Sequence, residues 1–186
     1  MVNKLVQSLL VLASFKLGFS CDKCAPGTLN GNTNIYAINS SPFVKINEGF
    51  YYFGQEKVNW FRAYESCRKL GSELVTFETP EEFEAVSGYL KDRGERSDHW
   101  TSGNDLGHHG THNWFTNAQP VSINRWAPKQ PNNSGGNQRC IHMGYIYDYS
   151  TDFQLNDRRC RDHKNSSMKY VCEIMMRAPP SFVVGK

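Results

Sequence analysis

The sequence predicts an α+β domain in which two helices and several short strands support one long irregular region. Two stretches, 59–71 and 79–90, carry apolar residues at helical spacing. Short runs rich in aromatic and β-branched residues precede and follow them, at 43–53 and within 140–174. The stretch between, 94–139, shows neither pattern. With no internal repeat, this order of elements indicates one domain with an elaborate loop region.

The first twenty residues have the features of a secretion signal. A basic Lys4 precedes an apolar stretch at 5–15, and small residues follow at Gly18 and Ser20. The apolar run is too short to span a bilayer. We expect 1–20 to be a signal peptide, with an interfacial amphipathic helix as the alternative. The polar, turn-rich residues 21–42 are expected to form a flexible arm.

Composition bounds the remaining chain. Of 186 residues, 39% are hydrophobic, which fits one domain, expected at 43–174, followed by a tail at 175–186. Without Lys4 and Lys16 of the leader, 21 basic residues become 19 against 18 acidic ones. A nearly neutral chain offers no electrostatic basis for nucleic-acid binding, and no segment suggests membrane insertion.

The first strands and the first helix are predicted from local signals. The run at 43–53 is expected to form one or two strands that turn at 47–49. Asn59 is a good N-cap, and Trp60, Ala63, Tyr64, Cys67 and Leu70 then share one helical face, while Gly71 ends the helix.

A short strand at 74–77 precedes the second helix. Thr79 is its expected cap, Pro80 lies in its first turn, and Glu82 completes a capping box. Glu81 and Glu82 lie where the helix dipole favours negative charge, so they need no catalytic explanation.

The region 94–139 is expected to be a long loop region that is ordered. Glycines and prolines interrupt it, but its aromatic side chains bury enough area to fix a loop; they are Trp100, Trp114, Phe115 and Trp126. Further strands are expected at 140–143, 153–155 and 170–174.

The chain contains six cysteines: Cys21, Cys24, Cys67, Cys140, Cys160 and Cys172. An even number behind a secretion signal indicates disulfides, although the residues alone leave the pairing open. Cys21 and Cys24 have redox-motif spacing, but no strand and crossover helix surround them. We favour two alternatives for them: Cys21 pairs with Cys24, or the two cysteines link neighbouring chains.

The order of these segments and cysteines resembles the C-type lectin domain over 43–174. The motifs that carry the resemblance are Trp-Thr-Ser-Gly at 100–103, Trp-Ala-Pro-Lys-Gln-Pro-Asn at 126–132 and Leu-Asn-Asp at 155–157. The resemblance implies two helices with antiparallel sheets and a long loop region. It also implies the disulfides Cys67–Cys172 and Cys140–Cys160.

The same resemblance implies a joint site for Ca2+ and sugar. Its ligands are the side-chain oxygens of Gln130, Asn132, Gln138, Asn156 and Asp157, the donor type that Ca2+ requires. Amide groups of the site donate to two vicinal sugar hydroxyls and the carboxylate accepts. Pro131 is expected to be cis. Without the cysteines, residues 130–138 would be interpreted as polar turn residues.

Two features of the expected site depart from the family pattern. Gln138 stands where the family usually has Glu, so only Asp157 is charged, and weak Ca2+ binding is expected. Asn133 and Arg139 stand where an auxiliary Ca2+ position uses carboxylates, so that position is expected to be absent.

The expected sugar is galactose. Gln130 is typical of galactose-type members and Asn132 of mannose-type members, and overall similarity to secreted invertebrate galactose-binding lectins favours galactose. The loop lacks the usual stacking aromatic; Trp126, His142 or an aromatic at 145–149 would have to replace it. Glycans on microbial or blood-cell surfaces are the expected partners, in agglutination or opsonisation, which require oligomers.

Asn39 and Asn165 lie in sequons and are candidate N-glycosylation sites. Asn132 also lies in a sequon, but a glycan there would block the site, so we expect it to be unmodified.

Two rival functions remain open. One is a Zn2+ site built from His108, His109 and His112, joined by His142 and His163, although the helix and the Glu of a metalloprotease are missing. The other is a lectin-like domain that binds a protein without Ca2+. With the cysteines bridged, no nucleophilic catalytic set is arguable, so the chain is expected not to be an enzyme.

Overall fold

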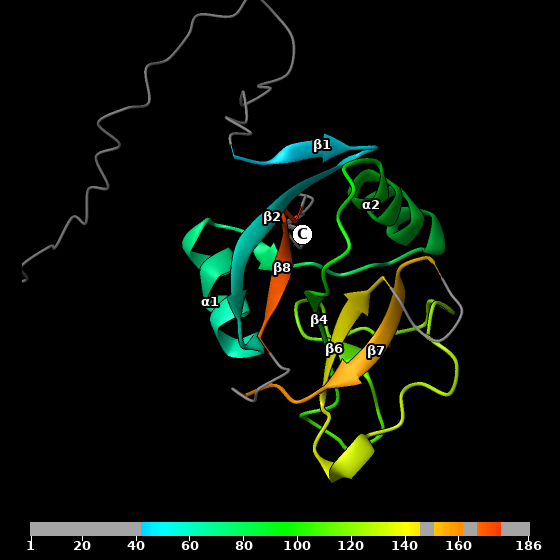
Figure 1. Ribbon diagram of the computed structural model, residues 1–186. Helices are drawn as coiled ribbons and strands as arrows, with labels where there is room; N and C mark the ends of the chain where they lie inside the picture. Colours follow the sequence, from blue (N-terminus) through cyan, green and yellow to red (C-terminus); the bar gives the residue numbers. More distant parts are fainter. Residues whose placement is uncertain (1–41, 146–150, 162–166, 176–186) are drawn as a thin grey trace, which may run out of the picture. The chain divides into compact units, whose positions relative to one another are not determined.

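The computed structural model describes residues 42–145, 151–161 and 167–175, and one mixed sheet runs through this part of the chain (Figure 1). Its main path has the strand order β1-β2-β8-β4-β6-β7, while β3 pairs with β8 and β5 pairs with β4. The strands are β1 Val44–Ile46, β2 Gly49–Val58, β3 Glu73–Leu74, β4 His99–Asn104, β5 Asn113–Trp114, β6 Cys140–Gly144, β7 Gln154–Arg158 and β8 Met168–Glu173.

The α+β prediction is confirmed, with one correction to the expected antiparallel sheets. β4 and β8 pair in parallel, and this pairing joins the two halves of the sheet. The other strand pairs of the described residues are antiparallel. Parallel neighbours need a long connection, and the chain between β4 and β8 supplies it with the loop region, β6 and β7.

The first hairpin follows the predicted pattern but extends further. β1 and β2 pair through a turn at Asn47, whose φ of 50° lies in the left-handed region that Asn tolerates. β2 continues to Val58, beyond the predicted end at 53. Residues 55–57 are polar and exposed, so no apolar alternation marked them; their backbone lies beside β8 across a register shift.

The first helix, α1, spans Trp60–Lys69 and begins as predicted. Asn59 accepts a hydrogen bond from the Arg62 backbone N–H at 2.9 Å. Cys67 is buried with two other residues of the apolar face. Leu70, expected on that face, is 39% exposed because it is the C-cap and lies past the last helical turn.

The second helix, α2, spans Pro80–Asp92, and its predicted capping box is only half present. Thr79 Oγ1 accepts from the Glu82 N–H at 3.2 Å. The Glu82 carboxylate does not return to Thr79: it accepts from the Glu78 N–H at 3.0 Å and from the Tyr51 hydroxyl at 2.6 Å. Glu82 therefore joins α2 to β2.

Both disulfides implied by the family resemblance are confirmed. Cys67–Cys172 ties α1 to β8 across a sequence separation of 105, and Cys140–Cys160 ties β6 to the segment after β7 across a separation of 20. All four sulfurs lie in one cluster of buried side chains with Trp60 and Trp100.

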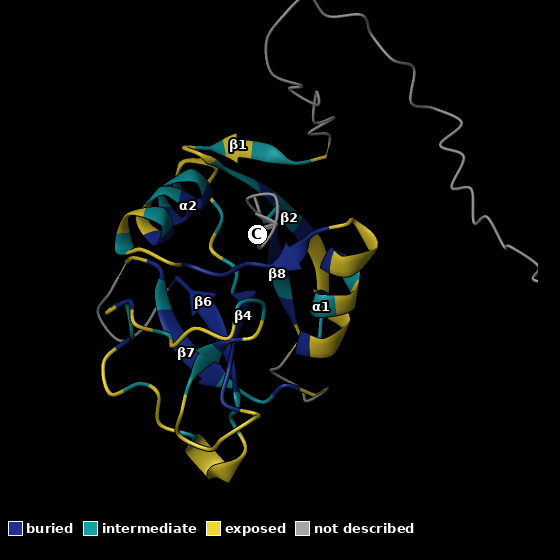
Figure 2. Cartoon of the chain, turned by 180° about the vertical axis from the view of Figure 1, so that it is seen from behind, coloured by how far each residue is buried: buried dark blue, intermediate teal, exposed yellow. Residues whose placement is uncertain are grey.

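Of the four aromatic residues expected to fix the loop region, Trp100 and Trp114 are buried and Trp126 is half-buried, but Phe115 is 52% exposed. Trp100 and Trp114 are among the largest fully buried side chains. The prediction missed that part of this region is regular: β4 is buried along its whole length, so it lacks the alternation of a half-exposed strand. Figure 2 shows the buried strands beside the exposed turn at η1, Ser134–Gly136.

Several predictions fall wholly or mostly outside the described residues. They are the signal peptide 1–20, the arm 21–42, the tail 175–186, Cys21, Cys24, Asn39, Asn165, His163 and residues 146–149. The predicted strand at 74–77 is shorter, since β3 ends at Leu74. Past its end, the Val75 N–H still donates to the Val171 carbonyl of β8 at 2.9 Å, and the Val75 carbonyl accepts from the Ser102 N–H of β4 at 2.8 Å. No helix of the described residues is long and apolar enough to cross a membrane.

Candidate calcium and sugar site

The predicted ligand residues come from two places that lie at one end of the sheet. Asn156 and Asp157 are in β7, paired with His142 and Ile141 of β6, and both are buried. The other three belong to the loop 130–138, which contains η1 (Figure 1). The disulfide Cys140–Cys160 links β6 to the segment after β7 and so fixes the strand that carries Asn156 and Asp157.

The loop has a defined backbone. The Gln130–Pro131 peptide bond is cis, as expected from the resemblance. Lys129 and Asn133 on either side have φ values of 62° and 44°, in the left-handed region. Together, the cis peptide bond and the two left-handed residues produce a sharp turn in this loop.

The carboxylate of Asp157 holds the loop 130–138 in place through hydrogen bonds to its backbone. Its Oδ1 accepts from the Asn132 N–H at 3.2 Å and its Oδ2 from the Asn133 N–H at 2.6 Å. Two further predicted ligands meet at one donor: the Ser134 N–H donates to Asn132 Oδ1 at 2.9 Å and to Gln138 Oε1 at 3.1 Å. The structure thus brings Asn132, Gln138 and Asp157 together.

The remaining two predicted ligands carry polar atoms that the described residues leave unsatisfied. Gln130 Oε1 and Asn156 Oδ1 are buried and have no hydrogen-bond partner among the described residues. A buried amide oxygen without a partner costs about 1–3 kcal/mol. A hard cation is bound by such oxygens. One carboxylate and four amide oxygens, two of them without partners, form a donor set that fits Ca2+.

Asp105 and Arg139 form an ion pair next to this loop. The Arg139 guanidinium bonds both to the Asp105 carboxylate and to its backbone oxygen. Burial would raise the pKa of Asp105, but hydrogen bonds from the Gly110 N–H and from Arg139 outweigh it and hold the pKa below its ordinary value. The charge of Asp105 is therefore matched by Arg139.

Within the part of the chain that the structure describes, the loop histidines contact separate partners and do not group as metal ligands. His108 Nδ1 lies 3.1 Å from Thr111 Oγ1, and His112 packs edge-on against Trp126 at 5.5 Å. His109 Nε2 accepts from Asn133 Nδ2 at 2.7 Å. The contact between His109 and Asn133 places the segment 108–112 against the loop 130–138, which we call the ligand loop. No local sequence signal indicated this arrangement.

Two of the side chains considered for sugar stacking are otherwise engaged. His142 is fully buried in β6, so it cannot offer a ring face to a sugar. Trp126 is half-buried and packs against the hydrophobic core as well as His112.

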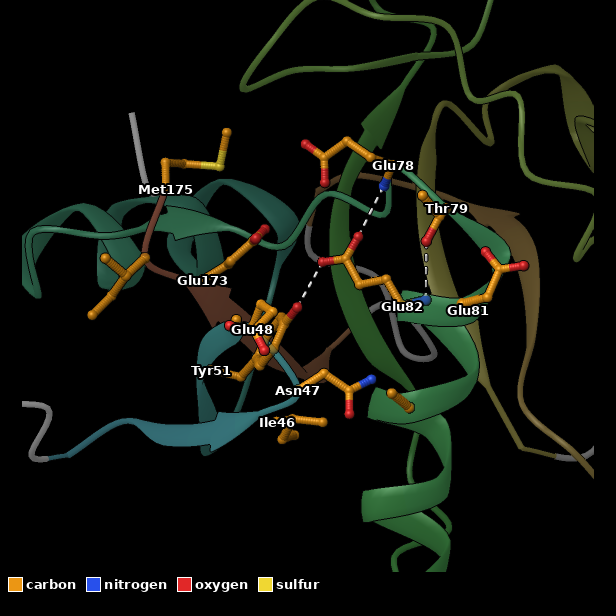
Figure 3. A pocket seen from close by; sticks show the side chains of 13 residues that line it. Ile46, Asn47, Glu48, Tyr51, Glu78, Thr79, Glu81, Glu82, Glu173 and Met175 are labelled. Atoms are coloured by element: carbon orange, nitrogen blue, oxygen red, sulfur yellow. Dashed lines mark hydrogen bonds between the residues drawn. The ribbon is translucent and has the colours of Figure 1, made fainter. Parts of the chain in front are cut away.

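A separate acidic pocket of about 430 Å³ lies between β1 and α2, at the other end of the domain from η1. Glu78, Glu82 and Glu173 turn their carboxylates into it, and Tyr51 donates to Glu82 (Figure 3). Burial raises the pKa of Glu82 to about 7, and burial together with the neighbouring carboxylates raises that of Glu173 to about 8. Sequence analysis explained Glu82 as a helix cap and missed this cluster.

Comparisons with known proteins identify the family. Residues 56–174 match the family model of the lectin C-type domain. C-type lectin 37Da of Drosophila melanogaster is 58% identical over 186 residues, which is 100% of both chains. Salivary C-type lectin 2 of Aedes albopictus is 28% identical over 127 residues, 66% of this chain and 82% of that one.

Solved structures agree. The mouse scavenger receptor C-type lectin carbohydrate-recognition domain has a TM-score of 0.59 at 25% identity, covering 74% of this chain and 97% of that one. CEL-I from Cucumaria echinata, at 19% identity, has a TM-score of 0.62 over 73% of this chain and 96% of that one, and shows the fold alone. The chain therefore belongs to the C-type lectin domain family, whose members bind carbohydrates and are not enzymes.

Proposed function

We propose that this chain is a secreted, calcium-dependent lectin of the galactose type. The observation that carries the proposal is the pair of buried, unpartnered amide oxygens of Gln130 and Asn156 beside the loop that Asp157 anchors. Family membership alone would leave a calcium-independent domain open. Unsatisfied oxygen ligands at the family's ligand positions favour a site that needs a cation.

Five side chains would hold the ion: Gln130, Asn132, Gln138, Asn156 and Asp157. Bound Ca2+ supplies coordination positions for two vicinal sugar hydroxyls. The chain's own contribution is to orient those hydroxyls: amide groups donate to them, and Asp157 accepts with the lone pairs that the Asn132 and Asn133 N–H groups leave free.

The charge of the site predicts its affinity. Asp157 is the one carboxylate among the five ligands, and Ca2+ affinity falls with the number of charged ligands. Extracellular calcium modules bind with dissociation constants on the order of 0.1–1 mM. An affinity in that range would suit a secreted protein, which meets Ca2+ at comparable concentrations.

Galactose is favoured by Gln130 at the start of the tripeptide, and mannose is the alternative. One solved structure supports the mannose alternative. The cow CD23 domain, 26% identical to this chain, was determined in the presence of a GlcNAc2Man3 oligosaccharide. Asn132 at the end of the tripeptide is the residue that would favour the mannose type.

Glycans on microbial or blood-cell surfaces are the proposed targets, with agglutination or opsonisation as the outcome. The proposal of secretion is supported by the apolar leader and by relatives named as salivary lectins. Cross-linking two cells requires at least two sites in one assembly, so an oligomer is part of this proposal.

Retention on immobilised galactose and mannose tests the proposal. We expect the protein to bind the galactose column in Ca2+ and to elute with EDTA. Stronger EDTA-sensitive retention on mannose would replace the sugar assignment. Absence of retention on both columns, or retention that EDTA does not affect, would favour the calcium-independent, protein-binding alternative.

A further inference from the structure

A second cavity lies beside the proposed sugar site, and its walls are apolar and basic. It encloses about 380 Å³ between the start of α1, the ligand loop and the segment after β7. We propose that this cavity takes the sulfate or carboxylate group of an acidic glycan whose neighbouring neutral sugar occupies the calcium site. The inference rests on the proposed function and names the class of glycan that the site would prefer.

The cavity and the ligand loop share a wall. Asn137, which lines the cavity, directly precedes the ligand Gln138, and Arg159 follows the ligand Asp157 by two residues. A Cβ built on Gly135 would lie 3.6 Å from Arg159 Nη2, so the guanidinium lies against the turn that closes the ligand loop. A glycan longer than one sugar could therefore reach both places.

Among the described residues, the cavity carries positive charge that no carboxylate pairs. Arg139 is neutralised by the buried Asp105, as described above. Arg159 and Arg161 also line the cavity, and neither forms an ion pair with any residue in the described ranges. Guanidinium groups bind planar or tetrahedral oxyanions through paired hydrogen bonds. Two of them at one cavity indicate an anionic ligand.

The two arginines are held on a fixed backbone. They flank Cys160, which is disulfide-bonded to Cys140 of β6, and the Cys160 carbonyl accepts from the Trp60 N–H at 3.0 Å. Fixing this segment before binding lowers the entropy that a ligand must offset. An anion therefore binds these two arginines at a lower entropic cost than it would bind two arginines on a free loop.

The apolar wall distinguishes a glycan from a free inorganic anion. Phe61 and Leu106 line the cavity and are 40% and 42% exposed, although most large apolar side chains of the domain are buried. These two side chains give the hollow an apolar surface that a ligand can cover. They can pack against the C–H face of a sugar ring while the arginines hold its acidic group, a combination that sulfate or phosphate alone would not use.

The test compares three ligands of the same length: a neutral galactoside, its sulfated form and its sialylated form. Titrations are made in Ca2+ and at low ionic strength. We expect at least one acidic ligand to bind about tenfold or more tightly than the neutral one, since one added charge-assisted hydrogen-bonded contact contributes about 1.5–3 kcal/mol. Whichever acidic form is preferred identifies the source of the anion.

Charge-matched variants locate the effect. Arg159→Gln with Arg161→Gln should reduce the acidic preference to about twofold or less while the neutral galactoside binds as before. Lys45→Gln with Lys57→Gln removes the same charge from exposed positions on β1 and β2 and should leave the preference intact. If the double arginine variant does not fold, the exposed Arg161→Gln alone should still lower the preference.

The outcomes separate this inference from the proposed function. Equal binding of neutral and acidic ligands, with EDTA sensitivity retained, overturns the subsite and leaves the lectin activity standing. An acidic preference that survives in the arginine variant, or that both double variants lose equally, also overturns the subsite. If no galactoside binds in Ca2+, the proposed function itself fails.

Discussion

Replacing Asp157 by Asn should disable the site while the domain remains folded. Asp157 is fully buried, and both of its carboxylate oxygens accept from backbone N–H groups of the ligand loop. An amide keeps one acceptor and turns an NH2 group toward the other N–H. One charge-assisted hydrogen bond is lost, which costs about 1.5–3 kcal/mol.

The loss of this hydrogen bond weakens calcium binding, because the bonds from Asp157 order the loop that carries Asn132. At about 1.4 kcal/mol per factor of ten, the Ca2+ dissociation constant should rise roughly 10-fold to 150-fold from loop ordering alone, before the loss of the site's charge is counted. Calorimetric titration with Ca2+ measures the change, and retention on immobilised galactose should disappear in parallel.

The matched control is Asp152→Asn, which removes the same charge near the start of β7. Asp152 is exposed and pairs with Lys91 at 2.9 Å, a surface ion pair that contributes about 0–1 kcal/mol. Calcium binding should be unchanged in this variant. If Asp157→Asn binds Ca2+ within a factor of about three of the parent, a difference of less than 1 kcal/mol, Asp157 does not hold the ion.

Further predictions follow from the disulfide, the titrating groups and the sequon. Replacing Cys140 and Cys160 by Ser opens a loop with a sequence separation of 20 and should lower the free energy of unfolding by about 3 kcal/mol, measured by urea denaturation; no change would show that this bridge does not restrict the unfolded chain. The folded-state pKa of Glu173, about 8, lies above its ordinary value, so stability in EDTA should fall as pH rises from about 4.5 to 8, and Glu173→Gln should reduce that fall and leave the smaller part that Glu82 contributes; an unchanged pH profile contradicts the assignment. Burial lowers the pKa of His99 to about 4 and that of His142 to about 3, so stability should be lost as pH falls from about 6.5 to 4, and His99→Leu should reduce this loss in thermal melts; an equal loss in the variant would assign it to other groups. Asn132 should be unmodified in active protein, and peptide mass spectrometry that finds it glycosylated would contradict the proposed site.

Features encoded within a few residues were predicted correctly from the sequence. Asn59 and Thr79 cap the helices because each needs a partner only three residues away. The ligand segments were located through the resemblance, since their motifs keep a fixed order relative to the cysteines. The resemblance implied ligand roles for Gln130 and Asn156, and these roles stay a prediction that their buried, unpartnered side-chain oxygens support.

Features that depend on long-range contacts were missed. Glu82 leaves its predicted partner because Tyr51, 31 residues earlier, offers a buried hydroxyl. Glu173 joins the acidic pocket only because β8 returns beside β2. His109 meets Asn133 across a separation of 24 residues, with no periodic pattern to indicate it. Such contacts depend on how the loop region folds back, which neither propensity nor spacing encodes.

The most direct measurement is a crystal structure of the protein grown with Ca2+ and galactose. We expect one ion bound by two hydroxyls of the same sugar and by the side-chain oxygens of the five proposed ligands, Gln130, Asn132, Gln138, Asn156 and Asp157. An ion located elsewhere, or a sugar bound at this loop without an ion, would contradict the account.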